Sequence, residues 1–283
     1  MKFQKVSIIG MGLIGGSLAS ALKKSNEVGE VIGIDRDKNS IDYALQNHII
    51  DKGFLNYDNN IHSSDVVVLA TYVDTIPAIA KEIKDFISKD TIVTDVGSVK
   101  SSIVREIESD YKIEYNFVGS HPIAGKEYSG VKYADPNLFQ GKICIITPTD
   151  STSSDVRETI SNFWKLIGCS VINKDPESHD FIFSYVSHLP HLVAYSLVNA
   201  VASADSDLNL FEFAGGGLND FTRIAGSSPE MWTSIFIANK EAVLESIKLF
   251  KSKINEIEEA VKSDNKDNLR KILFDIQSLK ISF

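Results

Sequence analysis

Short apolar runs alternate with helical patterns along the first part of the chain. The runs lack the polar alternation of half-buried strands, which is typical of strands covered on both faces. Seven runs are clear, at residues 6–9, 31–34, 66–69, 91–94, 117–118, 143–146 and 171–172. Strands that alternate with helices in this way predict an α/β fold with a Rossmann-type, mainly parallel sheet.

The pattern changes at the Asp175-Pro176 dipeptide, where the β-branched runs stop and helical periodicity continues alone. A long helix is predicted over residues 177–204, bent near Pro190 because proline removes a helix hydrogen bond. The sequence therefore predicts two domains. We expect residues 1–174 to form the domain that contains the sheet and residues 175–283 to form an all-helical domain.

A second long helix is predicted to begin at Pro229, with Ser228 as its N-cap, and to continue to Val261. Apolar residues follow one face of it, and residues 269–276 repeat the pattern in a last helix. This apolar face either packs inside the chain or forms a subunit interface, and we expect a homodimer through the helical domain. Its members in the second helix are Val243, Ile247, Phe250, Ile254, Ile257 and Val261.

Composition and charge narrow the classes of partner. The formal net charge is −9, which argues against general attraction to nucleic acid or to an anionic membrane. The two cysteines, Cys144 and Cys169, are too few for a disulfide framework and suit a reducing cytoplasm. Because glycines interrupt the apolar stretch at residues 6–22, we expect neither a targeting segment nor a membrane segment there.

A glycine-rich motif lies where the first strand meets the first helix. Gly10, Gly12 and Gly15 form GxGxxG, and Leu13 and Ile14 complete the motif at the start of the helix. Gly10 permits a tight turn, Gly12 lets a pyrophosphate approach the backbone, and Gly15 allows close helix packing. The glycines alone also fit a purely structural turn, so the motif needs a second signal.

Asp35 supplies that signal at the end of the second predicted strand, twenty residues after Gly15. A carboxylate there accepts hydrogen bonds from a ribose 2′-hydroxyl and repels a 2′-phosphate, which predicts NAD as the cofactor. The neighbouring Arg36 and Lys38 leave NADP open. The first half of the chain is thus predicted to bind a dinucleotide.

Two loops at the carboxyl ends of predicted strands carry candidate catalytic groups. His121 precedes a proline, and a histidine with an ordinary pKa near 6.5 can accept a hydroxyl proton at neutral pH, which oxidation of a carbinol by NAD requires. Ser98 either orients His121 or caps the helix after it. The alternative is that His121 has only a structural role in its loop. The dinucleotide-binding motif in the same domain favours the catalytic role.

The helical half adds histidines and an arginine. His179, His188 and His191 raise the question of zinc, but no HExxH motif is present and no acidic residue completes the set, so we expect no metal. Arg223 lies between apolar residues near a loop, which suits bidentate capture of a carboxylate. The alternative is a salt bridge with Asp220 that only fixes the loop.

These residues lie in motifs that resemble the prephenate dehydrogenase (TyrA) family of tyrosine biosynthesis. The matching segments occur in the family's order and span most of the chain. They are GMGLIGGSLA near the start, DVGSVK at residues 95–100, GSHPIAGKEYSG at 119–130, SHLPH at 187–191 and GGGLNDFTRIAGSSPEMW at 215–232. The glycine-rich segment is shared by many dehydrogenases, whereas the segments around His121 and Arg223 are specific.

The resemblance implies oxidative decarboxylation of prephenate. A hydride passes from C4 to NAD, the ring carboxylate leaves as CO2, and the ring becomes aromatic in 4-hydroxyphenylpyruvate. By motif position, His121 would accept the proton of the 4-hydroxyl and Ser98 would orient it. Arg223 would hold the ring carboxylate.

The resemblance further implies a substrate pocket lined by His191 and His188, with Trp232 as an apolar wall. Glu127 and Asp220 would form an ionic network around Arg223. The chain departs from the family at residues 70–72, where relatives usually carry a proline. Thr71 in that loop is nonetheless expected to contact the cofactor.

Other readings remain open at this point. Arogenate dehydrogenase differs only in the side chain of its substrate. A β-hydroxyacid dehydrogenase would need a catalytic lysine in the helical half, and no convincing equivalent is found. A dinucleotide-sensing protein without turnover is a third reading, which His121, Ser98 and Arg223 argue against. Because the sequence ends at Phe283, we expect no C-terminal regulatory domain.

Overall fold

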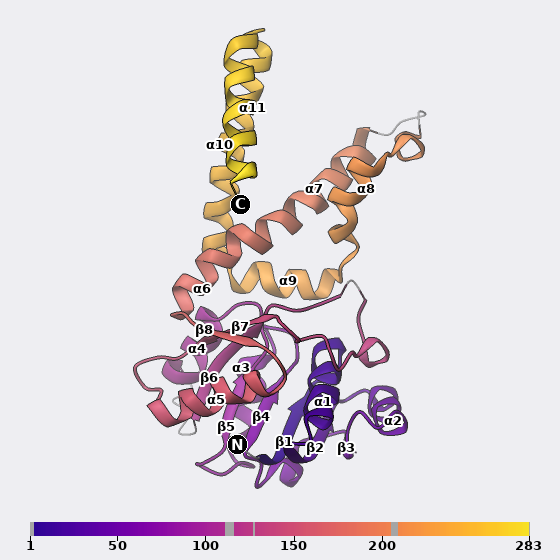
Figure 1. The fold of residues 1–283 in the computed structure, drawn as a ribbon, viewed down its shortest axis with the longest axis vertical. Helices are drawn as coiled ribbons and strands as arrows, with labels where there is room; N and C mark the ends of the chain where they lie inside the picture. The colour runs from indigo at the N-terminus through magenta and orange to yellow at the C-terminus, as the bar shows by residue number, and fades with distance from the viewer. Residues whose placement is uncertain (1–2, 111–115, 127, 205–208, 283) are drawn as a thin grey trace. The chain divides into compact units, whose positions relative to one another are not determined.

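A computed structural model of the chain describes residues 3–110, 116–126, 128–204 and 209–282. These residues divide into two compact units, Met1–Asn239 and Lys240–Phe283. The first unit holds the sheet and all the candidate site residues of the sequence analysis that the structure describes (Figure 1).

The described strands form one sheet in the order β3-β2-β1-β4-β5-β6-β7-β8. The strands from β1 to β6 run parallel, β7 is antiparallel to β6, and β8 is parallel to β7. Their bounds are β1 (Phe3–Ile9), β2 (Val28–Ile34), β3 (Lys52–Phe54), β4 (Val66–Leu69), β5 (Ile92–Asp95), β6 (Asn116–Pro122), β7 (Ile143–Thr147) and β8 (Ser170–Asn173). The predicted α/β fold with a mainly parallel sheet is therefore confirmed.

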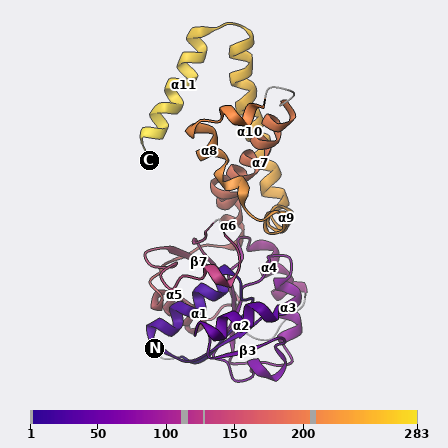
Figure 2. The same cartoon turned by 90° about the vertical axis from the view of Figure 1, so that its right-hand side faces the viewer.

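Helices cover both faces of this sheet, as the unbroken apolar strands require (Figures 1 and 2). In β4, Val66 and Val68 belong to one core cluster, while Val67 and Leu69 belong to the other, because successive side chains of a strand point to opposite faces. The first cluster includes side chains of α1 (Leu13–Ser25), α2 (Lys38–Gln46) and α5 (Ser154–Leu166), and the second includes side chains of α3 (Ile76–Ile83) and α4 (Ser101–Arg105).

The predicted helix over residues 177–204 is present in three consecutive segments. These are α6 (Pro176–Phe183), a π-helical segment at Ser184–His188, and α7 (Leu189–Ala204). The π-helical segment lies just before Pro190, whose missing N–H cannot bond the carbonyl one turn earlier. The helix thus departs from α geometry next to Pro190, where the sequence analysis predicts a bend.

The second predicted helix also exists but is not continuous. The side chain of Ser228 accepts a hydrogen bond from Met231 N at 3.2 Å, so the predicted N-cap is confirmed. The expected run to Val261 is wrong, because α9 (Pro229–Ala238) ends at Asn239 and α10 (Lys240–Lys262) follows. Asn239 lies between the two helices, and its side-chain amide donates to Asp180 O at 2.9 Å and bonds His188 Nδ1 at 3.1 Å.

The remaining helices are short or lie in the second unit. In the first unit, α8 (Gly216–Thr222) continues into a 3-10 turn at Arg223–Gly226. The second unit pairs α10 with α11 (Lys266–Ile281). Apolar side chains of both helices are exposed in the single chain, and they include Leu244, Ile254, Val261, Leu273, Phe274 and Leu279.

One helical segment, Pro176–Ala204, is long and apolar enough to cross a membrane, judged by length and composition alone. A single segment of this kind is weak evidence, because core helices of water-soluble proteins meet the same criterion. This one carries His179 and His188, both fully buried within the protein. The absence of a membrane partner stays a prediction.

Candidate active site

Five candidate residues gather at one edge of the sheet. Because β1, β2, β4, β5 and β6 are parallel, the loops that follow them open on the same side. Gly10 follows β1, Asp35 follows β2, Thr71 follows β4, Ser98 follows β5, and His121 lies near the end of β6. The neighbours of β1 are β2 and β4, so this edge also contains the point where the strand order reverses.

The glycine-rich turn has the geometry that a dinucleotide needs. Gly10 has φ +104°, and a Cβ there would lie 2.5 Å from Ala70 O. A Cβ on Gly15 would lie 1.9 Å from Gly10 O, so this glycine lets α1 approach the turn. A Cβ on Gly12 would meet nothing within 4 Å, which leaves open space at the helix N-terminus.

The first turn of α1 faces that space with unpaired donors. Gly12 is the N-cap and provides no side-chain cap, and Leu13 and Ile14 begin the helix. The first N–H groups of a helix have no intrahelical partner and carry partial positive charge. The residues present therefore fit a pyrophosphate at this position.

Asp35 is held in place by backbone donors on both sides. Its Oδ2 accepts from Met11 N at 2.7 Å, and its Oδ1 accepts from Asp37 N at 2.9 Å. The carboxylate is half-buried beside the glycine-rich turn, where it fits a ribose hydroxyl. Thr71 also lies beside this turn, since its Cγ2 would be 3.1 Å from a Cβ on Gly10.

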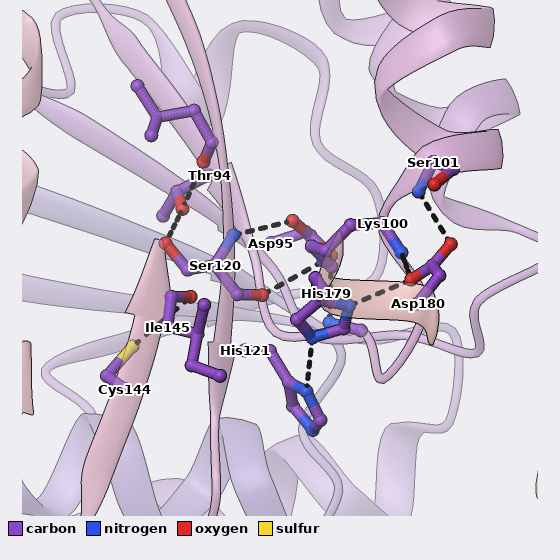
Figure 3. A network of polar contacts seen from close by, with 12 residues as sticks. Thr94, Asp95, Lys100, Ser101, Ser120, His121, Cys144, Ile145, His179 and Asp180 are labelled. Atoms are coloured by element: carbon purple, nitrogen blue, oxygen red, sulfur yellow. Dashed lines mark hydrogen bonds and ion pairs between the residues drawn. The ribbon is translucent and has the colours of Figure 1, made fainter. Parts of the chain in front are cut away.

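His121 is buried and bonded to a residue of α6. Its Nδ1 lies 2.8 Å from His179 Nε2, and His179 Nδ1 lies 2.8 Å from Asp180 Oδ1 (Figure 3). The ring of Phe183 packs against both imidazoles, with centroid separations of 4.7 Å to His121 and 4.6 Å to His179. His121 of β6 and His179 and Asp180 of α6 thus form a continuous chain of hydrogen bonds, which the Phe183 ring covers on one side.

Asp180 ties this chain to the loop after β5. Its Oδ1 accepts from Lys100 N at 2.7 Å, and its Oδ2 accepts from Ser101 N at 2.9 Å (Figure 3). The Lys100 side chain is fully buried and forms an ion pair with Asp95. Its Nζ also donates to Ser120 O at 2.9 Å, next to His121.

The surroundings keep His121 neutral. Burial lowers the pKa of His121 well below 6.5, and the charges of His179 and Lys100 lower it further. Burial also lowers the pKa of His179, and the Asp180 carboxylate opposes that effect. Burial alone would raise the pKa of Asp180, but hydrogen bonds from His179 and from two backbone N–H groups hold it below its usual value.

A second group of residues surrounds Trp232 in α9. The His191 ring stacks on Trp232 at 3.8 Å, and the His188 ring lies 6.1 Å from it. Burial lowers the pKa of His191, and the nearby charge of Arg223 contributes to the shift. Burial lowers the pKa of His188 to about 4. The structure thus brings together four of the predicted substrate-binding residues.

Three other predicted residues are less informative. Ser98 is half-buried, and within the described chain no hydrogen bond joins it to His121. Asp220 is exposed in α8, and Glu127 lies outside the described residues. Among the residues that the structure describes, no group of three or more His, Cys, Asp or Glu side chains could hold a metal ion.

The sequence analysis does not predict that His179 and Asp180 are hydrogen-bonded to one another and, through His179, to His121. His179 was considered only as a zinc ligand, and Asp180 was not singled out. His179 and His121 are 58 positions apart, and no local pattern links them. The available signal was an adjacent His-Asp pair inside an otherwise apolar helical stretch, where buried polar groups need partners.

Comparisons with known proteins match most of the chain. The family model of the prephenate dehydrogenase nucleotide-binding domain matches residues 18–173, and that of the prephenate dehydrogenase dimerization domain matches residues 175–275. Prephenate dehydrogenase from Bacillus subtilis (strain 168) is 34% identical over 266 residues, which cover 93% of this chain and 72% of that protein.

Two further relatives extend the likeness. Cyclohexadienyl dehydrogenase from Zymomonas mobilis subsp. mobilis is 30% identical over 269 residues, or 94% of this chain and 92% of that protein. The crystal structure of prephenate dehydrogenase from A. aeolicus, in complex with hydroxyphenyl propionate and NAD+, is 38% identical. It superposes with a TM-score of 0.94 and covers 100% of this chain and 99% of its own.

Two alanine substitutions separate dinucleotide binding from folding. Gly12→Ala adds a methyl group to open space, so we expect the melting temperature to stay near that of the wild type while the Kd for NADH rises about 10-fold or more. Gly15→Ala forces a methyl group onto a backbone oxygen and should cost about 3 kcal/mol of unfolding free energy. Fluorescence titration and urea unfolding measure the two effects. Unchanged NADH affinity in Gly12→Ala would place the pyrophosphate elsewhere.

Proposed function

The chain belongs to the prephenate dehydrogenase family, and we propose that it catalyses the NAD-dependent oxidative decarboxylation of prephenate to 4-hydroxyphenylpyruvate and CO2. The observation that carries the proposal is the position of His121. A neutral, buried imidazole lies at the same sheet edge as a glycine-rich turn and an Asp35 carboxylate that fit NAD. NAD supplies the hydride acceptor when it is bound.

His121 is the proposed proton acceptor for the 4-hydroxyl of the substrate. Its Nδ1 is engaged with His179, which leaves Nε2 as the nitrogen for the substrate. A neutral ring can take the hydroxyl proton as the hydride leaves C4, because its lowered pKa keeps it unprotonated near neutral pH. Ser98, in the adjacent loop after β5, is proposed to help orient the substrate hydroxyl beside this ring.

Arg223 and His191 are the proposed substrate-carboxylate contacts. Prephenate is a dianion and the protein carries a formal charge of −9, so binding requires local positive charge or hydrogen-bond donors. Arg223 lies close enough to His191 to influence its pKa. Trp232 Nε1 is buried and has no hydrogen-bond partner among the described residues, which supports a polar ligand beside it. Glu127 and Asp220 are proposed to complete the surroundings of Arg223.

The protein is also proposed to be a cytoplasmic homodimer with a dinucleotide-binding domain at residues 1–174 and a helical domain at residues 175–283. The match of residues 175–275 to a dimerization-domain model supports the dimer. Exposed apolar side chains on α10 and α11 support it independently, since large apolar patches of this kind usually face a partner. The two buried free cysteines agree with a reducing compartment.

Replacement of His121 tests the proposed reaction. His121→Asn should lower kcat by about 10² to 10⁴, the usual range for loss of a general base, with little change in the Kd for NAD. For the wild type, the acid limb of kcat/KM should lie below pH 6.5, because the folded pKa of His121 is lowered. NADH formation from prephenate and from arogenate measures both, with His62→Asn, an exposed histidine, as the control. Turnover of arogenate alone would overturn the assignment of prephenate.

Replacement of Arg223 tests the carboxylate contact. Arg223→Ala should raise the KM for prephenate by about 10- to 100-fold, which corresponds to the about 1.5–3 kcal/mol expected of a hydrogen bond to a charged group. The change in kcat should be smaller, because the contact exists in both the ground and transition states. Arg157→Ala, an exposed arginine of α5, is the matched control. An unchanged KM would remove Arg223 from the binding site.

Light scattering tests the proposed dimer. The expected mass in solution is about twice the 31.2 kDa of the chain. Leu273→Lys with Phe274→Lys places two charges among the exposed apolar residues of α11, and we expect the variant to shift toward the monomer. A monomeric wild type at micromolar concentration would contradict the proposal.

A further inference from the structure

Two consecutive hydrogen bonds join three buried side chains and end at the proposed proton acceptor, His121. Asp180 bonds His179, and His179 bonds His121, with both heavy-atom separations at 2.8 Å (Figure 3). His179 is fully buried, Asp180 is 4% exposed and His121 is 8% exposed. Water therefore has little access to compete for these hydrogen bonds.

The donors and acceptors in this arrangement can be assigned from the carboxylate outward. Asp180 accepts backbone N–H bonds from Lys100 and Ser101, so its two oxygens act as acceptors. His179 Nδ1 must then carry the proton in the bond to Asp180. In the neutral ring this leaves His179 Nε2 as an acceptor, and the matching donor is His121 Nδ1–H.

We propose that His179 and Asp180 are positioning residues that hold His121 as the Nδ1–H tautomer, with the lone pair of Nε2 free for the substrate hydroxyl. The inference rests on the proposed function of His121 and extends it to two residues of α6. The opposite tautomer would turn two nitrogen lone pairs toward each other at 2.8 Å and would present an N–H to the substrate. In that state Nε2 has no lone pair to accept the proton of the substrate hydroxyl.

The charges around the arrangement favour this assignment. Lys100, from the loop before α4, is paired with Asp95 of β5. His188, from the π-helical segment, faces the same region and has a pKa of about 4 because of burial, so it is neutral at pH 7. The charges of Lys100 and Asp95 largely cancel each other. The negative charge that acts on His179 is therefore that of Asp180.

The same arrangement accommodates the proton that His121 takes up. The proton moves from the substrate oxygen to His121 Nε2, and His121 Nδ1 keeps its own proton. The resulting imidazolium donates to His179 Nε2, whose ring is polarised by the Asp180 carboxylate. No electron transfer takes place within the three residues, and the Nε2 proton returns to the phenolate oxygen formed on loss of CO2, which gives the phenol of the product.

Nitrogen-15 NMR of the histidine-labelled wild type, without substrate, tests the tautomer directly. The signals of His121 are identified by their loss in His121→Asn. We expect a protonated Nδ1 and an unprotonated Nε2 at pH 7. A protonated Nε2 or a positively charged ring at this pH would overturn the proposal without any variant of α6.

Two substitutions of His179 test the consequence for turnover. In His179→Gln, the side-chain oxygen can replace Nε2 as the acceptor for His121. In His179→Asn, the amide can replace Nδ1 toward Asp180 but leaves His121 without its acceptor. We expect His179→Asn to lower kcat about 100-fold, with the KM for prephenate and the Kd for NAD within 2-fold of the wild type. His179→Gln should retain kcat within about 10-fold.

The readouts separate positioning from packing and from the proposed function itself. A packing role would lower the melting temperature of both variants and reduce kcat in both to a similar extent, which would contradict the proposal.

If His179→Asn does not fold, Asp180→Asn applies the same test, because an amide donor there reverses the direction of both hydrogen bonds. A wild type with the expected tautomer and no prephenate turnover would contradict the proposed function alone. His62→Asn should match the wild type in every measurement.

Discussion

The structure around the site depends on the burial of one carboxylate, that of Asp180. Removing a charged group from water costs several kcal/mol unless hydrogen bonds replace its hydration. Asp180 receives them from two backbone N–H groups at the start of α4 and from His179. The two backbone hydrogen bonds join α6 to the segment after β5. The third donor, His179, in turn bonds His121 near the end of β6. The position of His121 is thereby linked, through His179, to the carboxylate of Asp180.

A second buried ion pair supports the same loop from the sheet side. Asp95, at the end of β5, accepts from Gly97 N at 2.8 Å and from Ser120 N at 3.1 Å, and it pairs with Lys100. Loss of one partner from a pair without solvent access typically costs about 3–5 kcal/mol, because the other charge is left uncompensated. Lys100 therefore serves two purposes. Its side chain neutralises Asp95, and its backbone N–H stabilises Asp180.

The parts of this fold that were predictable are those encoded locally. The strand, the glycine-rich turn and Asp35 lie within one βαβ unit, and steric rules for Gly10 and Gly15 hold wherever the unit occurs. The N-cap at Ser228 is equally local. The three-residue strand β3 was missed because Lys52 and Gly53 give it no apolar run, and it exists only by pairing with β2.

The candidate site was less predictable where distant segments meet. Periodicity continues through Asn239 in the sequence, but α9 ends there, where the Asn239 side chain bonds Asp180 and His188. The contact of His121 with His179 arises because α6 returns across the carboxyl edge of the sheet, which no spacing rule encodes. Residue chemistry and position indicated His121 and Arg223, and the family resemblance added Trp232, but the hydrogen bonds from His121 to His179 and from His179 to Asp180 required the structure.

The distribution of buried charge explains why Arg223 carries so much of the proposed substrate recognition. Lys100, whose backbone N–H bonds Asp180, is fully buried and paired with Asp95, so its charge is not available to a dianionic ligand. His188 and His191 have lowered pKa values and contribute donors rather than positive charge. The neutral base and the cation thus lie on separate elements: His121 is buried near the end of β6, and Arg223 lies in a 3-10 turn after α8. This separation is chemically useful, because a positive charge directly beside His121 would lower its basicity further, whereas one at the carboxylate end of the substrate would not.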